Sequence, residues 1–173
     1  MGIRYRLGQF WRVLTAQPLP AGAWPELEQV LSPSELALYG RYRPGDQWHT
    51  YQVMRHLAAD GQDNPSLLAA ALLHDIGKTR ESIRLPGRVL VVLVEKLLPG
   101  RVAKWGSGEP HGWQRPFVIK MQHPAWGAEM AQAAGSDALT VSLIRRHQDP
   151  LPPQDQSPED QLLRRLQWVD DRH

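Results

Sequence analysis

Apolar residues recur along this chain at spacings of three and four, and Pro and Gly interrupt the pattern at intervals. Such spacing lines one face of a helix with apolar side chains, whereas a half-buried strand requires alternation of apolar and polar residues. No segment of the sequence sustains that alternation. The sequence therefore predicts an all-α fold.

The size of the chain limits how many hydrophobic cores it can form. Its 173 residues, of which 42% are hydrophobic, suffice for one core and are too few for two. We therefore expect a single domain over residues 1–173. Within it we expect an N-terminal extension over residues 1–45 and an insertion over residues 84–115, which are rich in Pro, Gly, Arg and Trp.

One predicted helix has recognisable signals at both ends. Asn64, which is followed by proline, has the form of an N-cap, and the helix is expected to run from Leu67 to Ile76. Gly77 then predicts a left-handed cap at its end. His74 and Asp75 are thus expected in the last helical turn.

Further helices are predicted in the second half of the chain. His123 precedes a proline and an Ala-rich stretch that extends to about Gly135, and residues 138–147 give another helical period. Ser157, followed by proline, has the form of a capped start for a last helix that reaches Asp170.

Helical phase indicates which polar side chains point inward. Asp170 follows apolar residues by four and by seven positions and lies on the apolar face, whereas Asp171 lies on the polar face. His49, His74 and His147 continue apolar faces in the same way. An ordinary core hydrogen bond explains any one of these histidines, but burying several polar groups on separate apolar faces favours a shared metal site.

Composition restricts the chemistry of such a site. The chain has no cysteine, so a metal must take nitrogen and oxygen ligands, and disulfides are excluded. It has 16 Arg and 4 Lys residues, a net charge of +2 and a pI near 9.1. This excess of arginine suits phosphate recognition by paired guanidinium hydrogen bonds, although a solvated basic surface explains it equally well.

The sequence also bears on membranes and nucleic acids. The apolar run at residues 89–94 ends at Glu95 and is far shorter than the roughly 20 residues of a membrane helix. The first 15 residues lack the continuous apolar segment of a signal peptide. We therefore expect a cytoplasmic protein with no membrane partner. Nucleic-acid binding is not expected, because the arginines are dispersed and no binding motif accompanies them.

The segment LLHDIGK at residues 72–78 resembles the signature of the HD superfamily of metal-dependent phosphohydrolases. A predicted helix carrying His49 precedes it and a helix carrying Asp170 closes the region, in the order H, HD, H, H, D that several branches show. The stretches around His123 and His147 resemble the two additional histidine motifs of branches that hold two metals.

This resemblance, which spans residues 46–171, implies a compact helical HD-domain fold with two divalent metal ions. Manganese, iron and zinc all suit imidazole and carboxylate ligands, so the ligand set does not choose among them. His74 and Asp75 are implied to be catalytic, because they hold metals that activate water. The implied ligands of the first metal are His49, His74, Asp75 and Asp170, and those of the second are His123, His147 and a bridging Asp75.

The resemblance also implies a reaction, namely hydrolysis of a phosphoester or phosphoanhydride in a small, nucleotide-like substrate. Lys78, Arg145 and Arg146 are the candidates for binding substrate phosphate, although the two arginines can equally form the solvated side of their helix. Trp105 or Trp113 can stack on a base or simply anchor packing. The substrate itself and the oligomeric state are not predicted.

Several branches and functions share this ligand set. No Gly-Tyr-Pro motif follows His147, which argues against the cyclic-di-GMP phosphodiesterase branch, whereas HD-type diadenosine tetraphosphate hydrolases have a similar six-ligand set. Some HD-fold enzymes use closely similar ligands as mixed-valent di-iron oxygenases. A non-catalytic module that keeps the metal for structure or senses a nucleotide is the third alternative.

Three histidines remain outside the predicted ligand set. His56 lies two turns beyond His49 on the same helical face and is a further candidate ligand. His111, in a predicted loop, and His173 are expected to be solvated.

Overall fold

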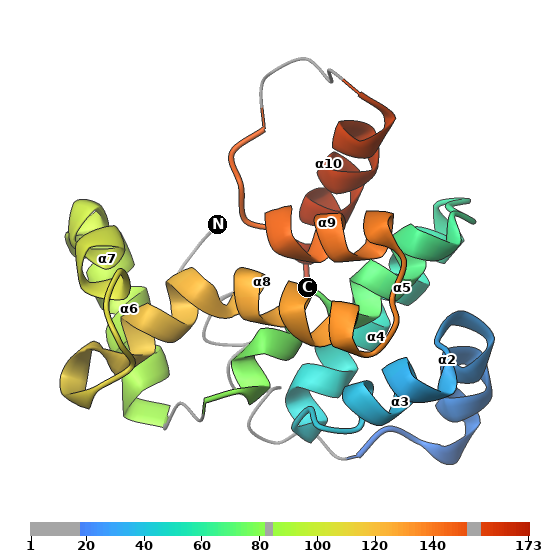
Figure 1. The fold of residues 1–173 in the computed structure, drawn as a ribbon, viewed down its shortest axis with the longest axis horizontal. Helices are drawn as coiled ribbons and strands as arrows, with labels where there is room; N and C mark the ends of the chain where they lie inside the picture. The colour runs from blue at the N-terminus through green and yellow to red at the C-terminus, as the bar shows by residue number, and fades with distance from the viewer. Residues whose placement is uncertain (1–17, 82–84, 152–156) are drawn as a thin grey trace.

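The part of the chain that the computed structural model describes, residues 18–81, 85–151 and 157–173, consists of helices and connecting turns without strands. The predicted all-α fold is confirmed (Figure 1). Residues 1–17 of the predicted extension lie outside the described residues. The α-helices are α2 (Trp24–Val30), α3 (Pro33–Tyr39), α4 (Pro44–Ala59), α5 (Pro65–Leu73), α6 (Leu85–Leu97), α7 (Pro99–Gly106), α8 (Arg115–Ala133), α9 (Ala138–Arg146) and α10 (Pro158–Asp170), and the short 3-10 helices are η1 (Ala21–Ala23), η2 (Ile76–Thr79) and η3 (Gly112–Gln114).

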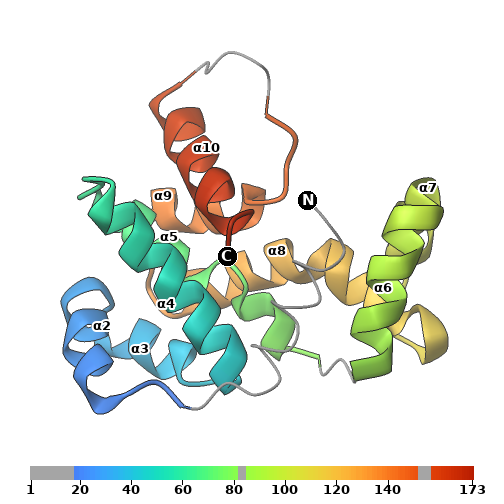
Figure 2. The ribbon, with the colours of Figure 1, turned by 180° about the vertical axis from the view of Figure 1, so that it is seen from behind.

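Helix α8 runs through the middle of the molecule, and the other elements pack along it. Its contacts include η2, α9, α6 and α7. Both views place α6 and α7 at one end of the long axis, away from α2 to α5 (Figures 1 and 2). The buried apolar residues accordingly form two clusters, of which the larger joins α2 to α5 with α8, α9 and α10.

The smaller cluster belongs to the region predicted as an insertion. Val91 of α6, Val102 of α7 and Phe117 of α8 are buried together, with Val94 and Trp105 packed against them. The described part of residues 84–115 is therefore a helical hairpin packed on α8, followed by η3. The assignment of residues 1–173 to one domain stays a prediction.

The predicted helix starts agree with the structure. The Asn64 side chain accepts a hydrogen bond from the Leu67 backbone N–H at 3.0 Å, and the Ser157 side chain accepts one from the Asp160 N–H at 3.1 Å. Helix α5 ends at Leu73, however, three residues earlier than expected, and the chain continues through His74 and Asp75 into η2.

The expectation of a left-handed cap at Gly77 is wrong. Positive φ occurs in the described residues only at Gly61, Gly112 and Gly135. Gly77 is required for another reason: a Cβ at this position would lie 2.0 Å from the His123 carbonyl oxygen. The absence of a side chain thus lets η2 approach the backbone of α8.

The helix expected to begin after His123 is longer than predicted, because α8 starts at Arg115 and continues through Pro124. Proline has no N–H to donate to the carbonyl four residues earlier, which is that of Lys120. The Lys120 carbonyl instead accepts a hydrogen bond from His123 Nδ1 at 3.0 Å. The His123 side chain therefore replaces the backbone donor that Pro124 lacks.

No helix in the described ranges has both the length and the apolar character that crossing a membrane requires.

Gly77→Ala should lower the free energy of unfolding by about 3 kcal/mol or more, because the added methyl group meets backbone atoms that cannot rotate away. Urea denaturation followed by circular dichroism measures this. Gly22→Ala is the matched control, since a Cβ there has no neighbour within 4 Å, and its effect should stay below about 1 kcal/mol. Equal stability of the two variants would contradict the close η2–α8 approach.

Candidate metal centre

The six side chains predicted as metal ligands come together from five separate parts of the chain. Two groups form, and within each group one ligand atom of every residue lies within 4.8 Å of the others. The first group is His49 from α4, His74 from the end of α5 and Asp170 from the end of α10, and the second is Asp75, His123 from α8 and His147 from the end of α9.

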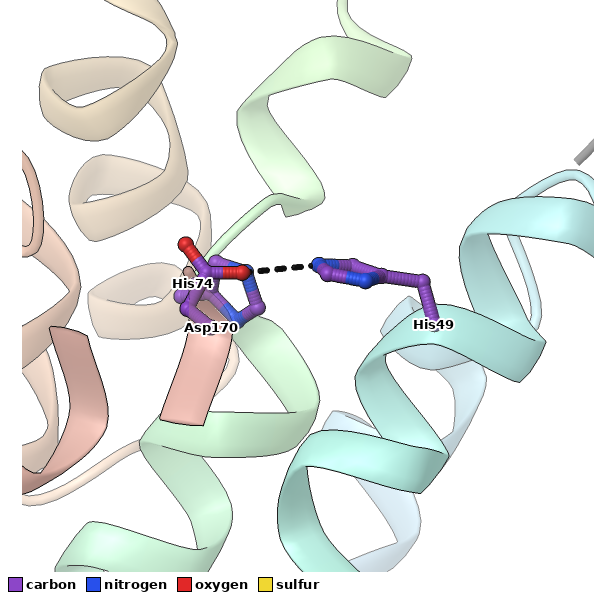
Figure 3. A group of neighbouring side chains, drawn as sticks. All are labelled: His49, His74 and Asp170. Carbon is purple, nitrogen blue, oxygen red and sulfur yellow. Dashed lines mark ion pairs between the residues drawn. The ribbon is translucent and has the colours of Figure 1, made fainter. Parts of the chain in front are cut away.

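The first group is partly open to solvent. The Nε2 atom of His49 lies 2.9 Å from Asp170 Oδ1, and the Nε2 atom of His74 lies 3.4 Å from the same oxygen (Figure 3). The helical phase of Asp170 is as predicted, and Asp171 is exposed. The Asp170 side chain was expected to be buried but is 28% exposed, and His49 is 21% exposed, so this group faces outward.

The second group is buried and is joined to the first by Asp75. The Oδ1 atom of Asp75 lies 3.3 Å from His123 Nε2 and 3.8 Å from His147 Nε2. Its other oxygen, Oδ2, lies 3.7 Å from His74 Nε2 and 4.0 Å from His49 Nε2. One carboxylate therefore presents a separate oxygen to each group.

Backbone hydrogen bonds fix the orientation of the three buried imidazole rings. A carbonyl oxygen can only accept, so each ring carries its hydrogen on Nδ1 and, when neutral, directs the lone pair of Nε2 into the centre. Metal-binding histidines commonly have such an outer partner. The Nδ1 donors and their acceptors are His74 to Ala71 at 2.9 Å, His123 to both Ile119 and Lys120 at 3.0 Å, and His147 to Ile144 at 2.7 Å.

Two features of these rings fit a bound cation. The buried Nε2 of His74 has no hydrogen-bond partner among the described residues. The Nε2 atoms of His123 and His147 lie 3.2 Å apart, although both are acceptors in the tautomers that their Nδ1 bonds impose. Facing acceptors repel unless a proton or a metal ion lies between them, so the residues present fit a metal centre.

The electrostatics of the first group favour positive charge at its centre. Burial alone favours a neutral His74, yet the carboxylates of Asp75 and Asp170 raise the pKa of this ring to about 9. Burial likewise opposes ionisation of Asp170, but His74 and His49 hold its pKa well below the usual range. Both carboxylates are therefore ionised at neutral pH and attract a cation to this position.

The second group supplies neutral nitrogen ligands. Burial, together with His74 and His123, lowers the pKa of His147 to about 3. Burial also lowers the pKa of His123. Neutral imidazole is the form that binds a metal, so these two rings can bind an ion without first losing a proton.

Of the three residues predicted to bind substrate phosphate, Lys78 alone contacts the centre. Its Nζ lies 2.5 Å from Asp75 Oδ2, and its side chain is 31% exposed. Burial opposes the charge of this ammonium group, but Asp75 raises its pKa, so Lys78 is cationic. Lys78 thus neutralises the shared carboxylate.

The two predicted arginines lie differently. Arg146 forms ion pairs with Glu159 and with Asp160, the latter at 2.7 Å, and thereby links α9 to α10. Arg145 is exposed, and none of the contacts made by the described residues connects it to the six-residue cluster. The structure therefore gives Arg146 a role in helix packing.

The remaining histidines lie outside both groups. His111 is exposed, as expected. His56 does not join the cluster: its Nδ1 lies 2.8 Å from His173 Nε2, and its Nε2 lies 3.8 Å from Asp60. The expectation that His173 is simply solvated is wrong, because its ring packs against His56 and is partly buried.

Two further polar side chains reach the centre without having been predicted. The Nε2 atom of Gln148 lies 3.4 Å from His123 Nε2. The hydroxyl of Tyr42 is buried without a hydrogen-bond partner among the described residues, and burial together with the charge of Asp75 raises its pKa well above the usual value. Adjacency to His147 could have indicated Gln148, whereas no local signal marks Tyr42.

The tryptophans of the hairpin region pack on each other. Trp105 contacts the rings of Trp113 and Phe117 at centroid distances of 5.0 and 5.1 Å, which makes it part of the smaller apolar cluster. Trp113 is 58% exposed.

The HD domain family model matches residues 47–172 of the chain. The chain belongs to the HD domain family. The HD superfamily resemblance predicted from the sequence is thereby confirmed, and an all-α fold is what an HD domain has. HD domains bind divalent metals and are generally hydrolases, and both His/Asp groups lie within the matched residues. No curated protein and no solved structure matches the chain.

Asp75→Ala should remove most of the bound metal, because both groups lose their shared oxygen ligand. His147→Ala should remove less of it, since only the second group is affected. Elemental analysis of the purified variants measures both. Asp171→Ala is the control and should keep the wild-type content, because Asp171 follows the end of α10, is exposed and belongs to neither group. Equal metal loss in the Asp75 and Asp171 variants would contradict the assignment.

Proposed function

We propose that this HD-domain protein is a metal-dependent phosphohydrolase that cleaves a phosphoester or phosphoanhydride bond in a small, nucleotide-like substrate. We further propose that it uses two divalent ions, with manganese, iron and zinc as the candidates. The observation that carries the proposal is the position of Asp75, whose two oxygens face different ligand groups. A shared carboxylate of this kind suits a paired metal site.

The six proposed ligands have different roles at the site. When bound, two divalent ions lower the pKa of a water nucleophile and neutralise charge that develops on a phosphoryl group. The buried His123 and His147 exclude bulk water from one side. The partly exposed His49 and Asp170 line the other side, and we propose that the substrate approaches there.

Lys78 is the proposed phosphate-binding residue. In the structure its ammonium group neutralises Asp75. Once Asp75 binds a cation, that cation neutralises the carboxylate. The Lys78 ammonium group can then bind a substrate phosphate oxygen beside Asp75. Arg145 stays a proposed phosphate-binding residue, whereas Arg146 is already paired with Glu159 and Asp160.

The same residues suit two other functions considered in the sequence analysis. These are a mixed-valent di-iron oxygenase and a non-catalytic metal-binding or nucleotide-binding module. No contact in the described residues favours either of them over hydrolysis. The cytoplasmic location and the absence of a nucleic-acid partner also stay predictions.

The reaction can be tested by measuring phosphate release from mononucleotides, dinucleoside polyphosphates and simple phosphoesters with each of manganese, iron, cobalt and zinc. The wild type should release phosphate or a nucleotide product with at least one ion. Asp75→Asn should lower kcat by a factor of about 1,000 or more, because the shared ligand is weakened, and Asp171→Asn should be unchanged. Oxygen consumption by an iron-loaded protein without hydrolysis would favour the oxygenase.

Lys78→Ala should raise KM by about tenfold or more and change kcat less, if its ammonium group binds substrate phosphate. Lys96→Ala is the matched control, because this residue is exposed on α6 and has no contact with the cluster among the described residues. Steady-state kinetics at fixed metal concentration separates KM from kcat. A fall in kcat with unchanged KM would assign Lys78 to the orientation of Asp75 instead.

A further inference from the structure

Exposed apolar side chains are concentrated on helix α6 and the residue that follows it. Nine large apolar residues of the described chain are more than about a third exposed, and six of them lie within residues 89–98. Scattered exposed leucines are ordinary on protein surfaces, but a contiguous group marks an interaction site. The six are Val89, Leu90, Val92, Leu93, Leu97 and Leu98.

Helix α6 carries apolar side chains on two sides, although only one side is covered. Val91 is buried against Val102 and Phe117, and this inner face anchors the helix to α7 and α8. Leu90, Leu93 and Leu97 follow one another at spacings of three and four and form an outer stripe. A helix packed on one side normally carries polar residues on the other, so the outer stripe requires a separate explanation.

Charge around the stripe is strongly positive. Residues 85–106 contain four basic residues and one acidic residue, Glu95, which lies 3.8 Å from Lys120. Lys96 of α6 and Arg101 and Lys104 of α7 are exposed, and none of them forms an ion pair within the described residues. An anionic surface is the complement of such a hairpin.

We propose that the α6–α7 hairpin binds an anionic lipid surface. The outer stripe of α6 inserts among the acyl chains near the headgroups, and Lys96, Arg101 and Lys104 contact the acidic headgroups. The hairpin lies at one end of the long axis of the molecule, where it can meet a surface without the α2–α5 part intervening (Figures 1 and 2). This is peripheral attachment, and it departs from the expectation of no membrane partner.

Two other occupants fit the hairpin less well. A second copy of the chain would bring two sets of exposed basic residues together, and like charges across an interface oppose association. A protein partner would be expected to bind through aromatic anchors, but the six exposed apolar side chains within residues 89–98 are all Val and Leu. Aliphatic side chains bordered by cationic ones are typical of helices that lie in the lipid interface.

Co-sedimentation of the full chain with vesicles tests the proposal. The wild type should bind vesicles of phosphatidylcholine with phosphatidylglycerol. Its affinity for vesicles of phosphatidylcholine alone should be lower by about tenfold or more. Leu93→Gln with Leu97→Gln should abolish binding, and Arg101→Glu with Lys104→Glu should weaken it by about tenfold or more. Both pairs are exposed, so circular dichroism spectra should match the wild type.

The control is Arg41→Glu with Arg165→Glu, which makes the same change in net charge at exposed positions outside the hairpin. Its binding should stay within about twofold of the wild type. Equal loss of binding in the control would overturn the proposal, because net charge alone would then explain the attachment. Failure of the wild type to bind either vesicle, or a dimer in analytical ultracentrifugation that the Leu93 and Leu97 changes dissociate, would also overturn it.

Discussion

The ionised carboxylate of Asp75 is the group on which the arrangement of the helices depends. Its side chain is 6% exposed, and a buried charge without compensation costs many kcal/mol. Compensation comes from several directions: Lys78 on η2, His74 next to it, and His123 on α8. His74 and Lys78 are neighbours of Asp75 in the chain, whereas His123 belongs to α8, so full compensation of this buried charge requires α8 to pack against η2.

Close approach of backbone elements makes that arrangement possible. Gly77 lets η2 meet α8 at the carbonyl of His123, one residue before Pro124. Pro124 leaves the Lys120 carbonyl without its helical donor, and His123 Nδ1 fills that place. The ring that faces Asp75 is thus oriented by an irregularity within its own helix. Local backbone chemistry and the geometry of the centre are consequently linked on α8.

The sequence predicted those parts of the structure that depend on local pattern. The all-α fold follows from apolar spacing, and the caps at Asn64 and Ser157 follow from residue type. Helical phase, which is also a local property of the sequence, distinguished the inward Asp170 from the exposed Asp171. The parts that it missed depend on contacts between distant residues: the space that η2 requires at Gly77, the ion pairs of Arg146 with α10, and the packing of His173 on His56. The sequence around these residues gives no signal for such distant partners.

The unequal exposure of the two ligand groups has a consequence for the order in which ions exchange. The side chains of His123 and His147 are 0% and 1% exposed, whereas those of His49 and Asp170 border solvent. With an ion in each group, as proposed, the inner ion could leave only after the outer side chains move, while the outer ion could leave directly. A chelator would then strip the outer position first, and the outer position would exchange ions with the surroundings more readily than the inner one.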